Sequence, residues 1–240
     1  MIKNLFAKNF KNNIKRIIKR IRLGSYLEMD YKQSFYIHNS QYSETLSNER
    51  EAKVHKDYTL NAGNKNSEAS TIYLTPNSAG YFLDKNLSIE KLIDIGAGTG
   101  WFVNYVRKNY IHFKEIYAIE PSNKAIEISK KIYGNKNRIT YIEKLALDAL
   151  RDIPKDLYLI TANIVFLHLP NRYSKKILKE LDKICLKGSV LIFHEPIGKS
   201  LLNNYFLHYA KKRSFWSKNL QNFNVNFEND NVVHAIKTRN

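Results

Sequence analysis

Residues 92–102 have the sequence Leu92-Ile93-Asp94-Ile95-Gly96-Ala97-Gly98-Thr99-Gly100-Trp101-Phe102. An apolar run of strand length leads directly into glycines at three alternate positions, and a helical pattern follows them. Glycine lets the backbone turn tightly and pass close to a bound molecule. A strand that enters such a turn and then a helix is typical of the ligand-binding edge of an open α/β sheet.

The chain beyond this segment alternates short apolar runs with helical patterns, which indicates parallel strands joined by crossover helices. We predict strands at Lys91–Ile95, Glu115–Glu120, Arg138–Glu143, Leu157–Asn163 and Ser189–Glu195, and helices at Gly100–Lys108, Ser122–Tyr133, Ser174–Cys185 and near Lys199–Arg213. A closing antiparallel hairpin is expected at Phe223–Phe227 and Val232–Lys237. The predicted fold class is α/β, a Rossmann-like seven-stranded sheet of five parallel strands plus this hairpin, with an N-terminal helical extension.

The N-terminal part of the chain has a different character. Residues 1–24 place isoleucine and phenylalanine on one helical face and lysine on the other, which predicts a basic amphipathic helix. Such a helix docks on the rest of the protein, lies on an anionic membrane, or lies along RNA. Residues 25–86 are polar and rich in tyrosine, and we interpret them as a cap or lid over a domain at 87–240.

The composition bounds the function. The 240 residues carry 39 Lys and Arg against 22 Asp and Glu, a formal net charge of +17. This charge favours anionic partners, although an A/T-rich coding bias would also enrich lysine. With one cysteine, Cys185, and no apolar run of membrane-spanning length, the chain is expected to be soluble and cytoplasmic, or at the inner face of the membrane.

The details of the glycine turn select among nucleotide-like ligands. Glu120 ends the second predicted strand, where an acid accepts hydrogen bonds from ribose hydroxyls. A dinucleotide fingerprint needs a third small residue at position 101, where this chain has Trp101. Asp94 is a poor neighbour for a pyrophosphate but suits the ammonium group of an amino-acid moiety. A P-loop would end in Gly-Lys-Ser/Thr, which this turn does not.

These residues resemble the class I S-adenosylmethionine-dependent methyltransferases, whose first motif has an acid followed by glycines in Gly-x-Gly-x-Gly spacing. Ile116–Pro121 resembles the second strand of that family, Leu186–Ile192 the turn before its fifth strand, and Ile164–Leu169 the segment after its fourth. The resemblance covers about residues 87 to 240 and implies S-adenosylmethionine as the cofactor. The residues that we assign to it are Asp94, Gly96, Ala97, Gly98, Gly100, Glu120, Asp148 and Asn163. For Asp148 a role as a solvated helix residue is left open.

Methyl transfer to an oxygen requires that the acceptor lose a proton, and a histidine near the ends of strands four or five would accept it. We therefore assign His168, His194 and Glu195 as candidate catalytic residues, with helix capping or backbone hydrogen bonding as the alternative for the histidines. No Asp/Asn-Pro-Pro-aromatic motif follows the fourth strand, and no His/Cys cluster has zinc spacing. No metal site is predicted.

The expected function is methyl transfer to an oxygen, with a nitrogen as the alternative, of a small-molecule or saccharide-like acceptor. A surface-polysaccharide precursor would fit the basic N-terminal helix, which would make contact with an anionic membrane. The alternatives are an RNA methyltransferase that uses this helix for phosphate contacts, and an inactive module that binds the cofactor.

Overall fold

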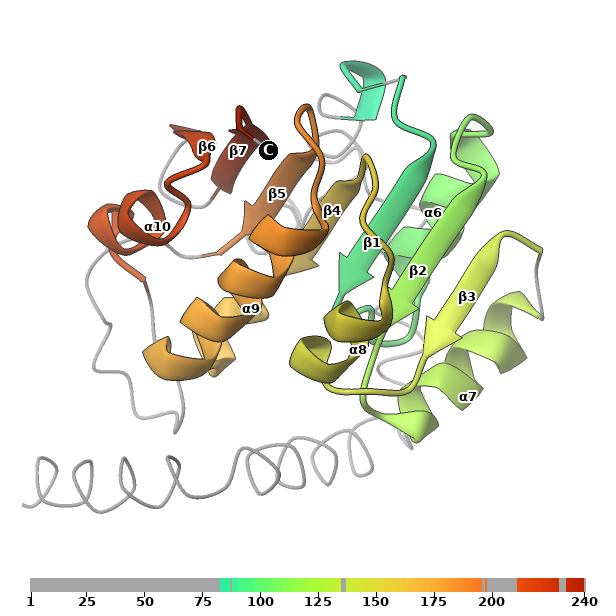
Figure 1. Ribbon diagram of the computed structural model, residues 1–240. Helices are drawn as coiled ribbons and strands as arrows, with labels where there is room; N and C mark the ends of the chain where they lie inside the picture. The colour runs from blue at the N-terminus through green and yellow to red at the C-terminus, as the bar shows by residue number, and fades with distance from the viewer. Residues whose placement is uncertain are drawn as a thin grey trace, which may run out of the picture. The chain divides into compact units, whose positions relative to one another are not determined.

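The computed structural model describes residues 83–86, 88–134, 137–195, 197, 211–228 and 232–239 (Figure 1). The basic helix predicted at 1–24 lies outside the described residues. So does the cap predicted at 25–86, except for residues 83–86. Within the described part, no helix is both long and apolar enough to cross a membrane.

A seven-stranded sheet with the strand order β3-β2-β1-β4-β5-β7-β6 forms the centre of the fold. The parallel strands are β1 (Lys91–Ile95), β2 (Glu115–Ile119), β3 (Ile139–Ile142), β4 (Leu159–Asn163) and β5 (Val190–His194). The antiparallel pair is β6 (Phe223–Glu228) and β7 (Val232–Lys237), and β7 pairs with β5. Five parallel strands and a closing hairpin confirm the predicted Rossmann-like seven-stranded sheet, whereas the predicted N-terminal helical extension lies outside the described residues.

Helices connect the strands. They are α6 (Trp101–Asn109), α7 (Asn123–Tyr133), α8 (Ala146–Asp152), the 3-10 turn η1 (Phe166–His168), α9 (Asn171–Ile184) and α10 (Arg213–Asn219). The prediction of a helix near Lys199–Arg213 is wrong at its end, because Lys211 pairs with Ile197 in an isolated bridge and Lys212 is extended. The helix begins only at Arg213 and buries Trp216.

The sheet has helices on both faces, and Figure 1 shows α8 and α9 in front of it. On the other face, Leu92, Leu159 and Val190 occupy paired positions on neighbouring strands and share a buried cluster with α6. Strands covered on both faces carry nearly continuous apolar sequence, which is why the sequence pattern predicts them well.

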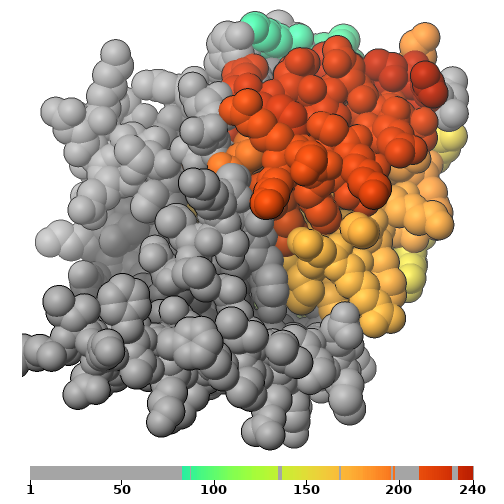
Figure 2. All heavy atoms as spheres, turned by 90° about the vertical axis from the view of Figure 1, so that its left-hand side faces the viewer, coloured from blue at the N-terminus to red at the C-terminus, as the bar shows by residue number. Residues whose placement is uncertain are grey.

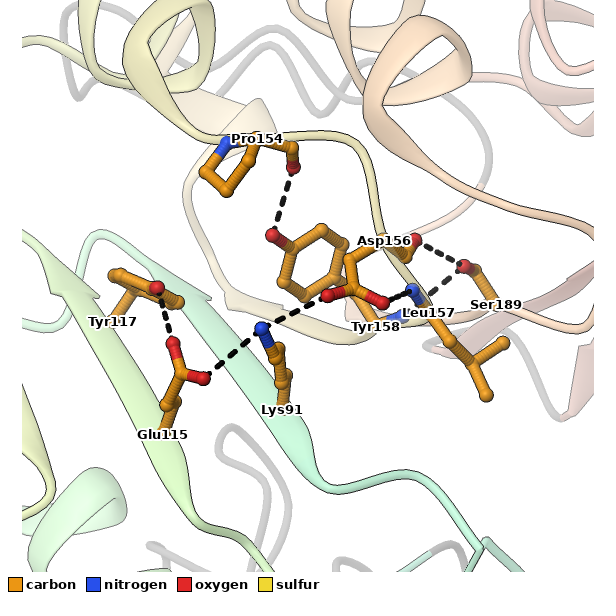
Figure 3. A network of polar contacts seen from close by, with 8 residues as sticks. All are labelled: Lys91, Glu115, Tyr117, Pro154, Asp156, Leu157, Tyr158 and Ser189. Atoms are coloured by element: carbon orange, nitrogen blue, oxygen red, sulfur yellow. Dashed lines mark hydrogen bonds and ion pairs between the residues drawn. The ribbon is translucent and has the colours of Figure 1, made fainter.

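The amino ends of the parallel strands are joined by a network of polar contacts (Figure 3). Lys91 Nζ lies 3.0 Å from Glu115 Oε1 and 2.8 Å from Asp156 Oδ2, so one ammonium group links β1 to β2 and to the segment before β4. The Ser189 hydroxyl accepts a hydrogen bond from the Tyr158 N–H at 3.1 Å, which extends the network to β5. These contacts hold the edge of the sheet opposite to the glycine turn.

Candidate active site

The glycine turn between β1 and α6 has the backbone geometry that its sequence predicts. Gly96, Gly98 and Gly100 have φ values of 72°, 53° and 74°, in the left-handed region that favours glycine. A Cβ on Gly96 would lie 2.5 Å from Val165 Cγ2. A side chain here would therefore collide with the segment that follows β4.

Glu120, just beyond β2, joins this turn to the neighbouring strand. Its carboxylate is buried and accepts hydrogen bonds from the N–H groups of Gly98 and Ser122, both at 2.9 Å. Burial raises the pKa of Glu120, and the two backbone N–H groups act in the opposite direction. An acid held at the tip of β2, against the middle glycine, is the arrangement expected for a residue that accepts hydrogen bonds from ribose hydroxyls.

Asp94, in β1, is a second buried acid beside the turn. It accepts a hydrogen bond from the Thr161 hydroxyl at 2.7 Å. Burial, with a smaller contribution from the charge of Glu120, raises the pKa of Asp94 to about 7 against the effect of the Thr161 hydrogen bond. Two desolvated carboxylates that repel one another favour a cation between or beside them, so these side chains suit a ligand with an ammonium or sulfonium group.

The last residues of β4 and β5 form a polar pair on the same face of the sheet. Asn163 and His194 are paired in register, and the Asn163 Oδ1 to His194 Nδ1 distance is 3.0 Å. Asp94 pairs with Thr161, which lies two residues before Asn163 and hence on the same face. Asp94, Thr161, Asn163 and His194 therefore lie along one side of the carboxyl edge, as a cofactor and an acceptor bound side by side would require.

The residue after Asn163 has a strained backbone that the sequence did not indicate. Ile164 has a φ of 56°, in the left-handed region where a β-branched residue is rarely found. Its N–H donates to the His194 carbonyl at 2.9 Å. Strain of this kind persists where the surrounding structure enforces it, often at functional sites.

Glu195 follows β5 and is buried, with 2% of its surface exposed. Its carboxylate accepts hydrogen bonds from three consecutive backbone N–H groups, of Val165, Phe166 and Leu167, at 2.6, 2.7 and 2.8 Å. Burial raises the pKa of Glu195 to about 7, against the effect of these three donors and of Lys211. The sequence indicated where this acid lies but not that backbone amides surround it.

The remaining predicted residues lie at the edges of the site or beyond it. Ala97, between the glycines, is buried, and its N–H donates to the Ile119 carbonyl at 3.0 Å. The side chain of Asp148 is 56% exposed on α8 and lies 3.4 Å from Arg151, as the alternative of a solvated helix residue requires, and its assignment to the cofactor stays a prediction. His168 ends η1, and its side chain lies outside the described residues. Burial raises the pKa of the Cys185 thiol, at the end of α9, to about 12, which makes a nucleophilic role unfavourable.

Comparison with known families identifies the domain. A family model described as a methyltransferase domain matches residues 56–229, most of the chain. The chain belongs to this methyltransferase family. The result confirms the family predicted from the glycine turn and the two acids, and it shows that the protein is an enzyme that transfers methyl groups. Among curated protein sequences, none matches this methyltransferase.

Solved structures share the fold at low sequence identity. Magnesium protoporphyrin IX methyltransferase from Synechocystis PCC 6803, with bound S-adenosylhomocysteine (SAH), is 17% identical, with a TM-score of 0.50 over 67% of this chain and 79% of that one. Human N-acetylserotonin methyltransferase in complex with S-adenosylmethionine (SAM) is 12% identical, with a TM-score of 0.51 over 68% and 52%. A SAM-dependent methyltransferase from Archaeoglobus fulgidus is 16% identical, with a TM-score of 0.53 over 64% and 70%.

Proposed function

We propose that this methyltransferase transfers the methyl group of SAM to an oxygen of a small-molecule acceptor, with saccharide-like alcohols as the leading class. Three findings support SAM as the donor: the family, the glycine turn with its two buried acids, and the SAM or SAH in similar structures. The observation that carries the choice of oxygen is the hydrogen-bonded pair of Asn163 and His194 beside the cofactor turn.

The chain supplies the groups that this donor needs. In this proposal the Glu120 carboxylate accepts hydrogen bonds from the ribose hydroxyls, and Asp94 faces the positive charge of the amino-acid part, which their burial beside the glycine turn supports. When bound, SAM supplies an electrophilic methyl group on a positively charged sulfur. Alignment of the acceptor and exclusion of water are then the main contributions of the protein.

The Asn163–His194 pair fixes the tautomer of the histidine. With the amide oriented as in the structure, Asn163 Oδ1 only accepts hydrogen bonds, so His194 Nδ1 carries the proton. The lone pair of the neutral ring is then at Nε2. A ring held in this tautomer at the end of β5 is suited to accept the proton that a hydroxyl loses as it attacks the methyl carbon. An amine acceptor with its own lone pair does not need this step.

The test combines cofactor binding with turnover. Calorimetry should show that SAH binds to the wild type and to His194→Gln with equal affinity. In a screen of sugars and other alcohols against amines, His194→Gln should reduce kcat on a hydroxyl acceptor by about a hundredfold or more. His112→Gln is the matched control, since His112 lies before β2, at the opposite edge of the sheet. Failure of the wild type to bind SAH, or full activity of His194→Gln, would overturn the proposal.

We further propose that the enzyme meets its acceptor at an anionic membrane surface. One exposed face of α9 carries five basic side chains at helical spacing, and α10 adds two more beside it: Arg172, Lys175, Lys176, Lys179 and Lys183, then Arg213 and Lys218. Figure 2 shows α9 and α10 next to each other on one face of the molecule. The acids of α9, Glu180 and Asp182, are paired with Lys183 and Lys237. Glu180 offsets Lys183, so the excess positive charge of α9 comes from Arg172, Lys175, Lys176 and Lys179. A surface with such an excess attracts anionic lipid headgroups and concentrates lipid-linked substrates.

Vesicle flotation tests this surface. The full chain should bind vesicles of phosphatidylcholine with phosphatidylglycerol, and not phosphatidylcholine alone. A triple variant, Lys175→Glu, Lys176→Glu and Lys179→Glu, should lose this binding, while a triple variant at Lys124, Lys130 and Lys131 of α7 serves as the matched control. Equal binding by both variants, or binding to RNA in place of vesicles, would contradict the membrane surface.

A further inference from the structure

The segment between β4 and α9 is held by two buried charged side chains from other parts of the chain. Glu195 binds its first part through the N–H groups of residues 165–167. Lys211 binds its last part, because its ammonium group donates to the Leu169 carbonyl at 2.6 Å. We call residues 165–169 the β4 segment, and Glu195 with Lys211 its clamp.

Packing alone does not account for this clamp. Glu195 and Lys211 are each only 2% exposed, and a buried charge must be compensated by hydrogen bonds or an opposite charge. The aromatic rings of Phe166, Phe193 and Trp216 pack on one another in the same region, so apolar side chains fill this core readily. Apolar residues would stabilise such a core at least as well as a charged pair. What the two charges add is a fixed backbone geometry for the β4 segment.

The β4 segment, in turn, contacts the cofactor turn. Val165 donates its N–H to Glu195, and its Cγ2 occupies the space that a side chain on Gly96 would need. The strained Ile164 and the end residue Asn163 come immediately before it. A chain of direct contacts therefore leads from Glu195 through Val165 to the first glycine, and it passes beside Asn163.

We infer that Glu195 is a positioning residue, which holds the β4 segment so that Val165 sets the geometry of the Gly96 turn for the cofactor. This inference rests on the proposed function, since it assigns a role to the turn as the SAM site. It replaces the catalytic role predicted for Glu195 from its place after β5, because the two carboxylate oxygens face backbone N–H groups.

Glu195→Gln tests the clamp with little change of shape. The amide keeps one acceptor oxygen but brings an NH2 group toward an N–H that needs an acceptor, so at least one of the three hydrogen bonds is lost. Hydrogen exchange of the ligand-free protein should show faster exchange of the amides of residues 165–167. By calorimetry, SAH affinity should fall by up to about tenfold, because only part of the molecules then keep the turn geometry that binds the ligand. Glu127→Gln, at an exposed position on α7, is the matched control.

A spectroscopic measurement separates positioning from a general loss of stability. The chain has 9 glycines, so a sample labelled with nitrogen-15 at glycine gives few amide signals. Glu195→Gln and Val165→Ala should both shift the Gly96 signal and weaken SAH binding, but only Glu195→Gln should speed exchange at residues 166 and 167. Lys91→Met, at the other edge of the sheet, should lower stability without either effect.

The outcomes distinguish the two proposals. If the wild type binds SAH, and Glu195→Gln or Val165→Ala binds it equally with an unmoved Gly96 signal, the positioning role is wrong while the proposed function stands. If the wild type binds no SAH, the proposed function fails, whereas the exchange and the Gly96 signal still report on the clamp. Should Glu195→Gln not fold, Val165→Ala still tests the last contact of the chain, and an unmoved Gly96 signal with unchanged SAH affinity in that variant would overturn the inference.

Discussion

Asp94 shows how one residue links burial to ligand binding. Among the described residues, its carboxylate accepts a hydrogen bond from the Thr161 hydroxyl, and burial raises its pKa to about 7. Near neutral pH, part of the ligand-free protein therefore carries a proton on Asp94. A cationic ligand group favours the ionised form and expels that proton.

Asp94→Asn should weaken SAH binding by about tenfold or more, because a charge-assisted contact is lost. In the wild type, affinity should rise as pH increases through about 7, and binding should release protons. Calorimetry in buffers with different ionisation enthalpies measures this release. Asp94→Asn should release fewer protons, and Asp152→Asn, on the surface of α8, should behave as the wild type. Binding without dependence on pH would show that Asp94 does not face the charge.

The sequence predicted the residues whose chemistry is local. An acid, three alternate glycines and a second acid after the next strand define a turn that depends on adjacent positions, and the structure brings these residues together at the carboxyl edge of the sheet. The sequence could not predict the strained backbone at Ile164 or the backbone amides that surround the Glu195 carboxylate. Both depend on how the ends of β4 and β5 meet, which no short stretch of sequence encodes.

Among the helices and strands too, those with a clear pattern in adjacent residues were predicted, and those without one were not. The parallel strands were predicted to within two residues at each end, since a strand buried on both faces is an apolar run between polar turns. The helix α8 was not predicted, because its seven residues make fewer than two turns and so give little periodicity. Lys211 and Lys212 were assigned to a helix because the pattern does not reveal that Lys211 is buried against the β4 segment.

The ion pairs at the amino edge should contribute to stability but not to cofactor binding. Lys91 contacts Glu115 and Asp156 at partly exposed positions, and these contacts raise the pKa of Lys91 and lower that of Asp156. The pKa of Glu115 is lowered by the hydrogen bond from the Tyr117 hydroxyl and then by Lys91. Lys91→Met should therefore lower the free energy of unfolding by about 1 kcal/mol, at the upper end for exposed pairs. Denaturant unfolding measures the expected loss of stability, and calorimetry with SAH measures the expected unchanged affinity. A loss of SAH affinity would mean that the two edges are coupled.

The molecule as a whole has an asymmetric distribution of charge across its sheet. At the amino edge, the acids are paired with a lysine and their pKa values are lowered. At the carboxyl edge, Asp94, Glu120 and Glu195 are buried and their pKa values are raised. The edge that holds the site therefore keeps desolvated charge that weakens the ligand-free fold, a common compromise between stability and function.

This asymmetry predicts an unusual dependence of stability on pH. Because the folded pKa values of Asp94 and Glu195 lie above the unfolded ones, the folded state holds protons more tightly than the unfolded state. The stability gained from protonation is present at acidic pH and is lost as pH rises through about 7. Denaturant unfolding of the ligand-free protein should give a free energy about 1 to 3 kcal/mol higher at pH 6 than at pH 8. Protonation of Lys211, whose pKa burial lowers to about 8, acts in the opposite direction between pH 6 and pH 8 and reduces the gain. Protonation of His112 and His234, whose pKa values burial also lowers, limits the gain below pH 6.

Two further measurements identify the groups that cause this dependence of stability on pH. The double variant Asp94→Asn and Glu195→Gln should lose most of the slope between pH 8 and pH 6, whereas Lys91→Met should keep it. Saturating SAH should add more stability at pH 8 than at pH 6, because the ligand binds the ionised form of Asp94 and stabilises the folded state in proportion to its affinity. A ligand-free protein that becomes steadily less stable from pH 8 to pH 6 would show that these acids stay ionised, held by their hydrogen bonds against the effect of burial.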